Sequence, residues 1–212
     1  MKAEYVDHMG NDLTVVNAAR VSFDKHVTEF QDKDDRLVYF LARNGHFTPF
    51  THVMVTLRET VPIFVARQRF KHTVGFSYNE VSRRYVSDDP EFFTPNEWRL
   101  AAAEVKQGSS TNTLDEDSIV PYDVARHIEK SVKLYRQMLS QGVCAEQARM
   151  VLPQSMYTSY YVTGSLSAWS RAYTLRAEKT AQREIQDLAD SWARIIEPLF
   201  PVSWAALTYD GE

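Results

Sequence analysis

Apolar and polar residues alternate along the chain with two periods, one typical of helices and one typical of strands. Apolar positions three and four residues apart predict helices over 12–22, 32–43, 63–70, 122–141, 145–152, 166–176 and 181–199. Alternation with a period of two predicts strands over 3–9 and 52–61. Residues 156–162 are aromatic and β-branched, which favours a strand and leaves a helix as the alternative. Residues 82–86 are a further candidate for extended chain.

Residues with special backbone preferences mark where these elements begin and end. We expect Asp12 to cap the first helix and Asn44-Gly45 to end the second in a left-handed turn. Pro62 suits the first turn of a helix, and Gly75 indicates a loop over Thr73–Phe76. In the strand predicted over 52–61, one face carries Val53, Val55, Leu57 and Glu59.

The segment 106–121 (KQGSSTNTLDEDSIVP) is polar and acidic and has no periodicity. Because helical segments of comparable apolar content flank it, we predict a surface loop within one domain, not a linker between two. No internal repeat occurs along the chain. The expected fold is α+β, a single mixed domain over 1–212 in which a small sheet is flanked by long helices.

The composition, with 44% hydrophobic and 25% charged residues, is that of a soluble globular protein and excludes collagen and coiled coil. The single cysteine, Cys144, excludes an internal disulfide and a cysteine-based zinc or iron–sulfur site, and we expect no metal. Residues 1–13 are too polar for a signal peptide, and no run of about 18 apolar residues occurs. We therefore expect a cytoplasmic protein without a membrane segment.

Basic charge is concentrated in residues 65–85 (VARQRFKHTVGFSYNEVSRRY). This block has five basic side chains and one acidic one, a net charge of +4, so the remainder of a chain with net charge −4 carries −8. Interleaved arginines and aromatic rings suit a ligand with phosphate groups and flat bases. A nucleotide phosphate site, an ordinary basic surface and a site for single-stranded nucleic acid are the alternatives, although the acidic whole argues against general coating of nucleic acid.

Two further groups of charged residues lie in predicted helices. Glu146 and Arg149 are three residues apart and share a helix face, and Arg171 and Arg176 belong to another predicted helix that also holds Trp169 and Tyr173. Surface ion pairs alone would account for them. The chain has seven glycines and no glycine-rich phosphate loop, so side chains would have to hold any phosphate.

The block Arg67–Thr73 followed by Ser77–Tyr85 resembles the signature of the flavin-dependent thymidylate synthases. In that signature, seven residues separate an Arg-His-Arg triplet from a serine. Similar landmarks recur in the family's order at Gly10–Leu13, Ala18–Ser22, Gly45–Phe50, Pro62–Gln68, Ala148–Pro153 and Leu175–Ala177. The signature has diverged in this chain. Lys71-His72-Thr73 replaces Arg-His-Arg, and eight residues instead of seven separate this triplet from Ser82. Gly75 is the expected place of the extra residue.

The resemblance implies an enzyme that reductively methylates dUMP to dTMP, with methylenetetrahydrofolate as carbon donor and NADPH as reductant through FAD. The residues it assigns to dUMP are Gln68, Lys71, Glu80, Ser82, Arg83, Arg84, Arg149 and Arg176. The residues it assigns to FAD are Ser22, His46, Thr48, Lys71, His72, Thr73, Glu80, Ser165 and Arg171. At two of these positions, Ser165 and Arg171, the family often has asparagine.

The family uses no cysteine nucleophile, so the resemblance implies that Cys144 is a bystander. It assigns catalysis to Arg176, whose guanidinium would stabilise the negative charge that develops on uracil as N3 ionises. Family members are homotetramers with shared active sites, and we expect a homotetramer here, in the cytoplasm of a cell or of a virus-infected host. A nucleotide-binding or nucleic-acid-binding relative without turnover is the alternative.

Overall fold

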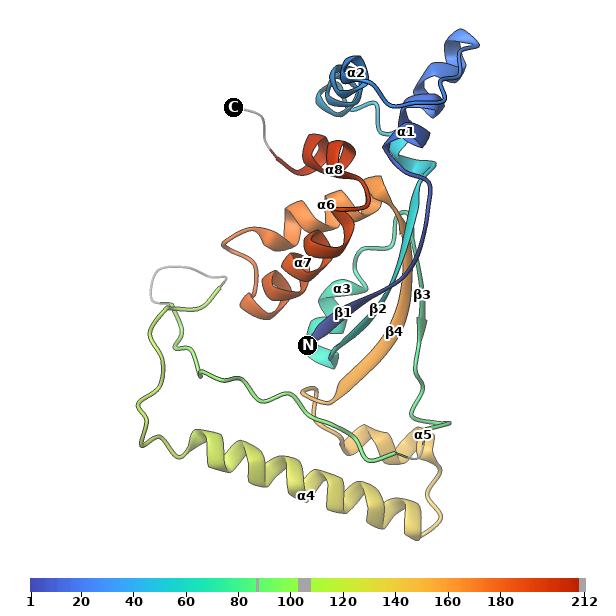
Figure 1. Ribbon diagram of the computed structural model, residues 1–212. Coiled ribbons are helices and arrows are strands. Elements are labelled where there is room, and N and C mark those ends of the chain that lie inside the picture. The colour runs from blue at the N-terminus through green and yellow to red at the C-terminus, as the bar shows by residue number, and fades with distance from the viewer. Residues whose placement is uncertain (87, 103–107, 210–212) are drawn as a thin grey trace.

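Four antiparallel strands form one sheet in the computed structural model, which describes residues 1–86, 88–102 and 108–209 (Figure 1). Across this sheet the order is β1-β2-β4-β3, with bounds β1 Lys2–Met9, β2 Met54–Pro62, β3 Phe76–Glu80 and β4 Tyr157–Ser165. The α-helices of the described ranges are α1 Asp12–Arg20, α2 Asp32–Arg43, α3 Ile63–Arg69, α4 Val120–Ser140, α5 Ala145–Ala148, α6 Leu166–Ala177, α7 Arg183–Ile196 and α8 Pro201–Thr208. Short 3-10 helices follow α1, precede β2 and follow α5, at Val21–Phe23, Thr48–Thr51 and Arg149–Val151. The predicted α+β class, a small sheet flanked by helices, is confirmed.

The two faces of the sheet differ in polarity, as the alternation in the sequence predicts. On β2 the side chains of Val55, Leu57 and Val61 are fully buried, and Glu59 is buried on the same face. Figure 1 shows α3, α6 and α7 along this face. The opposite face carries polar pairs between β2 and β4, such as the 2.9 Å hydrogen bond between the hydroxyls of Thr56 and Thr163.

Tryptophans fill the centre of the core between the sheet and the helices. Trp169 on α6 and Trp192 on α7 have no exposed surface, and their ring centroids lie 5.5 Å apart. The indole Nε1 of Trp169 donates to the carbonyl oxygen of Val55 over 3.1 Å. This bond satisfies a polar group that would otherwise be buried without a partner, and it fixes α6 against β2.

The first helix is capped by Asn11, so the prediction that Asp12 caps it is wrong. The side chain of Asn11 accepts a hydrogen bond from the backbone nitrogen of Thr14 over 3.1 Å. Asp12 instead accepts from the backbone nitrogens of Val202 and Ser203, at 3.0 and 2.9 Å. Its carboxylate therefore caps α8, a helix that the sequence analysis did not predict, across the domain.

The bounds of most predicted elements are confirmed within two or three residues. The strand favoured for residues 156–162 is also confirmed, as part of β4. The exceptions lie between α3 and α4. Residues 76–80 form β3, where a loop was predicted to reach Phe76, and a turn at residues 83–85 interrupts the extended chain expected over 82–86. Phe76 pairs with Gly164 of β4, so this short strand depends on a partner far away in the sequence.

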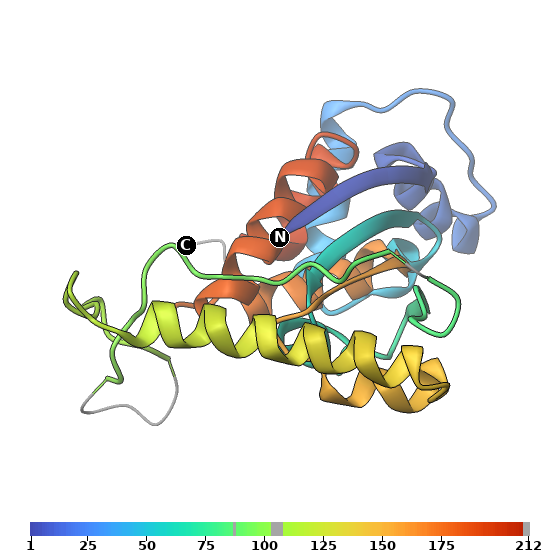
Figure 2. The same cartoon turned by 90° about the horizontal axis from the view of Figure 1, so that it is seen from below.

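Residues 88–102, which lie between β3 and α4 in the chain, run past the lower end of the sheet and beside the long helix α4 (Figure 2). The carbonyl oxygen of Glu91 accepts from the nitrogen of Tyr157 over 2.8 Å, and the nitrogen of Phe93 donates to the carbonyl of Ser155 over 2.8 Å. Of the loop predicted over 106–121, residues 106 and 107 lie outside the described residues, and α4 begins at Val120. Among the described residues, no helix is long and apolar enough to cross a membrane.

Candidate active site

The residues expected to bind dUMP fall into two groups, one at each end of β3. Lys71 and the cluster around His72 precede the strand, whereas Glu80 ends it and Ser82–Arg84 follow. A strand rises about 3.3 Å per residue, so the ends of β3 are roughly 13 Å apart. On a single chain the two groups of expected dUMP residues therefore lie at opposite ends of this strand.

The group that follows β3 lines a cleft of about 600 Å³ below the sheet. Four of the expected dUMP residues line it, namely Glu80, Ser82, Arg83 and Arg149. The carboxylate of Glu80 accepts a hydrogen bond from the hydroxyl of Thr158 over 2.6 Å. Arg84 lies next to the cleft, since its Nη1 is 3.4 Å from Oε1 of Glu146, which lines the cleft.

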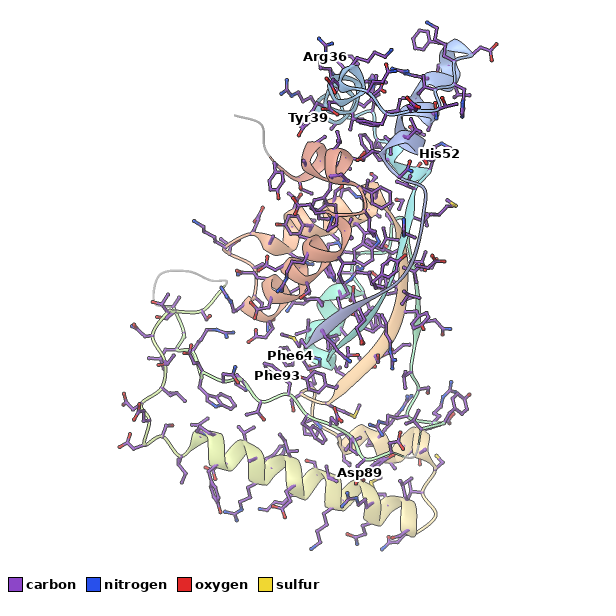
Figure 3. The ribbon with its side chains drawn as sticks, in the orientation of Figure 1. Arg36, Tyr39, His52, Phe64, Asp89 and Phe93 are labelled. Carbon is purple, nitrogen blue, oxygen red and sulfur yellow. The ribbon has the colours of Figure 1, made fainter. Side chains whose placement is uncertain are left out.

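Backbone carbonyls and carboxylates engage several arginines around this cleft. The guanidinium of Arg83 donates to the carbonyl oxygens of Asp88 and Asp89, and this holds its charge toward the cleft. The carboxylate of Asp89 pairs with Arg136 of α4 over 2.8 Å, near the junction of α4 and the sheet's lower end (Figure 3). The arginines are thus preorganised, which lowers the entropy cost of holding an anion.

The group that precedes β3 is centred on His72. Its ring nitrogen Nε2 accepts a hydrogen bond from Nε of Arg176 over 2.9 Å. Burial, followed by the positive charges of Arg176, Arg69 and Arg171, lowers the pKa of His72 from 6.5 to about 4. At pH 7 the imidazole is therefore neutral and can act as the acceptor that orients Arg176.

The turn that leads into β3 is held against the first turn of α6. The guanidinium of Arg171 donates from Nη2 to the carbonyl oxygen of Val74 over 2.8 Å. Gly75 has a φ of +78°, and a Cβ there would lie 2.9 Å from Cβ of Ala168. Ser165 caps α6 by accepting from the nitrogen of Ala168 over 3.3 Å. Lys71 and Thr73, on either side of His72, are exposed.

A second cavity, of about 400 Å³, lies between α2, α6 and α8. Its walls are mainly apolar, with Phe47, Phe50 and Leu175 among them, and Arg171 supplies a positive charge. His46 and Thr48 are exposed on either side of Phe47. Ser22 lies on the exposed 3-10 helix Val21–Phe23, outside the lining of both cavities. Of the expected FAD residues, the structure thus brings Arg171, Ser165, His72 and Thr73 together and leaves Ser22 and Glu80 apart.

Gln68, the remaining expected dUMP residue, is bound by residues that the sequence analysis did not identify. Its Nε2 donates to Oε1 of Gln182, and Nε2 of Gln182 donates to Oε2 of Glu184 over 2.8 Å. Arg99 donates to the other oxygen of Glu184 over 2.6 Å. The sequence places Glu184 in the first turn of a helix, where acidic residues are common, so nothing there distinguished it.

Beneath the His72 turn lies a buried ion pair that the sequence analysis also missed. Arg69 and Glu59 have no exposed side-chain surface, and Nε of Arg69 is 3.2 Å from Oε1 of Glu59. Burial raises the pKa of Tyr78 to about 12, so its hydroxyl stays protonated and donates to the carbonyl of His72 over 2.7 Å. Nη1 of Arg69 donates to the same hydroxyl over 2.5 Å. The signal in the sequence was Glu59 on the apolar face of its strand.

Known proteins share both the sequence and the fold. The family described as thymidylate synthase complementing protein matches residues 4–202. The flavin-dependent thymidylate synthase of Thermosipho africanus is 39% identical over 202 residues, 95% of this chain and 88% of that protein. That of Thermus thermophilus is 38% identical over 202 residues, 95% of this chain and 73% of that protein. A crystal structure of the UMP/dUMP methylase PolB from Streptomyces cacaoi, bound with 5-Br dUMP, matches with a TM-score of 0.86 and 30% identity, covering 97% of this chain and 93% of that one.

The chain therefore belongs to the family of flavin-dependent thymidylate synthases. The match spans both groups of residues around β3, as well as α6 with Arg176. The expectation drawn from the diverged signature Lys71-His72-Thr73 is confirmed at the level of the family.

Proposed function

We propose that this protein methylates dUMP to dTMP in a flavin-dependent reaction, as the names of its relatives suggest for them. The observation that carries this proposal is the pair formed by Arg176 and a neutral His72. With Nε engaged by the imidazole, the plane of the Arg176 guanidinium is set, and its terminal nitrogens remain as donors in a rigid fork. A preorganised positive charge of this kind stabilises negative charge that develops on a uracil ring during reaction.

The second cavity fits part of a flavin. Its apolar walls, with Phe47 and Leu175, suit a flat ring system, and the guanidinium of Arg171 suits an anionic group. His46, Thr48, His72, Thr73 and Ser165 are the neighbouring residues assigned to FAD. When bound, a flavin supplies the hydride that reduces the transferred carbon. The role of the protein is to exclude water from the flavin ring and to hold the nucleotide against it.

The two part-sites at the ends of β3 support a shared active site. Each contains residues assigned to dUMP, yet on one chain only the group that follows β3 lines the cleft. We infer that the cleft with Ser82, Arg83 and Arg149 of one subunit meets Gln68, Lys71 and Arg176 of another. A homotetramer with active sites between subunits satisfies this requirement, with methylenetetrahydrofolate as carbon donor and NADPH as reductant.

The test is the anaerobic conversion of dUMP to dTMP by purified protein supplied with FAD, methylenetetrahydrofolate and NADPH. We expect turnover by the wild type, visible flavin absorbance in the protein, and a tetramer in sedimentation. Omission of each component in turn identifies which ones the reaction needs. A colourless protein without turnover that binds oligonucleotides with steep salt dependence would overturn the proposal in favour of nucleic-acid binding.

A further inference from the structure

A directional chain of hydrogen bonds ends at Gln68, one of the residues assigned to dUMP. We propose that Glu184 is a positioning residue that fixes the side-chain amide of Gln68 for the nucleotide, acting through Gln182. This inference rests on the proposed function, since it takes Gln68 to contact dUMP. The contacts that support it are those from Gln68 to Gln182 and from Gln182 to Glu184.

The direction of the chain follows from the chemistry of its end. An ionised carboxylate only accepts hydrogen bonds, so the amide nitrogen of Gln182 must face Glu184. Oε1 of Gln182 then faces Gln68, which must in turn present its own nitrogen. The carbonyl oxygen of Gln68 and one amide hydrogen are left for the ligand. A lone glutamine amide could rotate by half a turn and exchange these roles.

Glu184 keeps the negative charge that this argument needs. Its side chain is 8% exposed. Burial by itself raises the pKa of its carboxyl group, but hydrogen bonds from Arg99 and Gln182, together with the charge of Arg99, outweigh burial and lower the pKa. Glu184 is therefore ionised at pH 7 and accepts from both neighbours at once.

Arg99 connects this chain to the segment between β3 and α4. Its Nε donates to the hydroxyl of Ser109 over 2.8 Å, while its Nη2 binds Glu184. The guanidinium occupies Oε1 of Glu184, which leaves Oε2 for Gln182. Each carboxylate oxygen thus has its own partner, so the orientation of Gln182 is specified.

A double-mutant cycle tests the proposal on the tetrameric, FAD-loaded enzyme. Glu184→Gln preserves size but can donate as well as accept, which removes the direction of the chain. We expect it to weaken dUMP binding about 5- to 10-fold in calorimetry and to raise KM more than it lowers kcat, because an orienting hydrogen bond is lost. In a Gln68→Ala background the same change should alter the Kd less than about 2-fold, since the residue it acts through is gone.

A matched control lies one turn along the same helix. Asp187 forms an exposed pair with Arg183 over 3.0 Å, and Asp187→Asn should leave the Kd for dUMP unchanged. Gln182→Met, at a half-buried position, breaks the middle of the chain and serves if Glu184→Gln lowers the melting temperature strongly. It should raise the Kd to the same extent as Glu184→Gln.

The outcomes separate this inference from the proposed function. A wild type that does not bind dUMP overturns both. If the wild type binds dUMP and Gln68→Ala weakens binding, but Glu184→Gln has no effect or an effect that adds independently to Gln68→Ala, only the positioning role is overturned. Coupled effects with unchanged binding in Asp187→Asn support it.

Discussion

Arg176 donates a hydrogen bond from Nε to Nε2 of His72 over 2.9 Å, although the two residues are 104 positions apart in the chain. The bond requires an unprotonated nitrogen on the imidazole, and the lowered pKa of His72 provides it at neutral pH. The pair therefore joins two residues to which the family resemblance assigned different ligands, His72 to FAD and Arg176 to dUMP. Under the proposed function, the base of the nucleotide and the flavin would meet beside this pair.

Arg176→Lys should lower kcat for dTMP formation about 100-fold or more while the protein stays folded. Lysine keeps the positive charge but has no Nε to bond to His72 and no planar fork, so the charge is no longer held in place. Rates under anaerobic conditions with saturating dUMP measure the effect. Arg183→Lys, in an exposed ion pair on α7, is the control and should retain full activity. A kcat within a factor of about three of the wild type would contradict the assigned role.

The stability of the protein should depend on pH through His72. The folded protein binds a proton there only near pH 4, whereas the unfolded chain binds it near 6.5. Between these values the unfolded state holds more protons, so the free energy of unfolding falls as the pH falls from about 6.5 to about 4. Because the ring is only half-buried, we expect a contribution of about 1–2 kcal/mol.

His72→Gln isolates this contribution, because glutamine retains an acceptor for Arg176 but does not titrate. Urea unfolding of both proteins at pH 7 and at pH 4.5 gives the comparison. The wild type should lose about 1–2 kcal/mol more than the variant over this range. Equal losses in the two proteins would show that the protonation of His72 is not coupled to unfolding.

Local patterns in the sequence were sufficient for most helices and for β2, because their periodicity and end signals lie within the element itself. β3 was missed because its five residues depend on β4. A Cβ on Gly164 would lie 2.4 Å from the ring of Phe76, so the strand forms only where its partner has a glycine. α8 was missed because an apolar segment after Pro201 shows no amphipathic period.

The candidate site was predictable as a set of residues but not as an arrangement. The family signature singled out Glu80, Ser82 and Arg176, yet no spacing in the sequence indicates that the first two lie at the opposite end of β3 from the third. Glu184 carried no signal, since an acidic residue in a first turn is ordinary. Its role depends on a contact with Arg99, which lies 85 residues earlier in the chain.

Asp12→Ala should destabilise the protein by about 1–2 kcal/mol, although its own helix keeps the Asn11 cap. The change removes two hydrogen bonds to the first turn of α8, from Val202 and Ser203. Phe200, the residue before this helix, offers no side-chain cap of its own. Urea unfolding measures the loss. Asp32→Ala, at an exposed position in the first turn of α2, is the control and should cost under about 0.5 kcal/mol.

Cys144→Ala should leave the rate of dTMP formation within about 2-fold of the wild type. Cys144 is exposed and precedes α5, five residues before Arg149, which lines the cleft. In the proposed mechanism the positive charge of Arg176 stabilises negative charge on the uracil ring, so no bond between a thiolate and the ring is needed. Alkylation of the wild type with iodoacetamide provides a second measurement and should likewise spare activity. Complete loss of turnover in a folded, flavin-loaded Cys144→Ala tetramer would contradict a mechanism without a cysteine nucleophile.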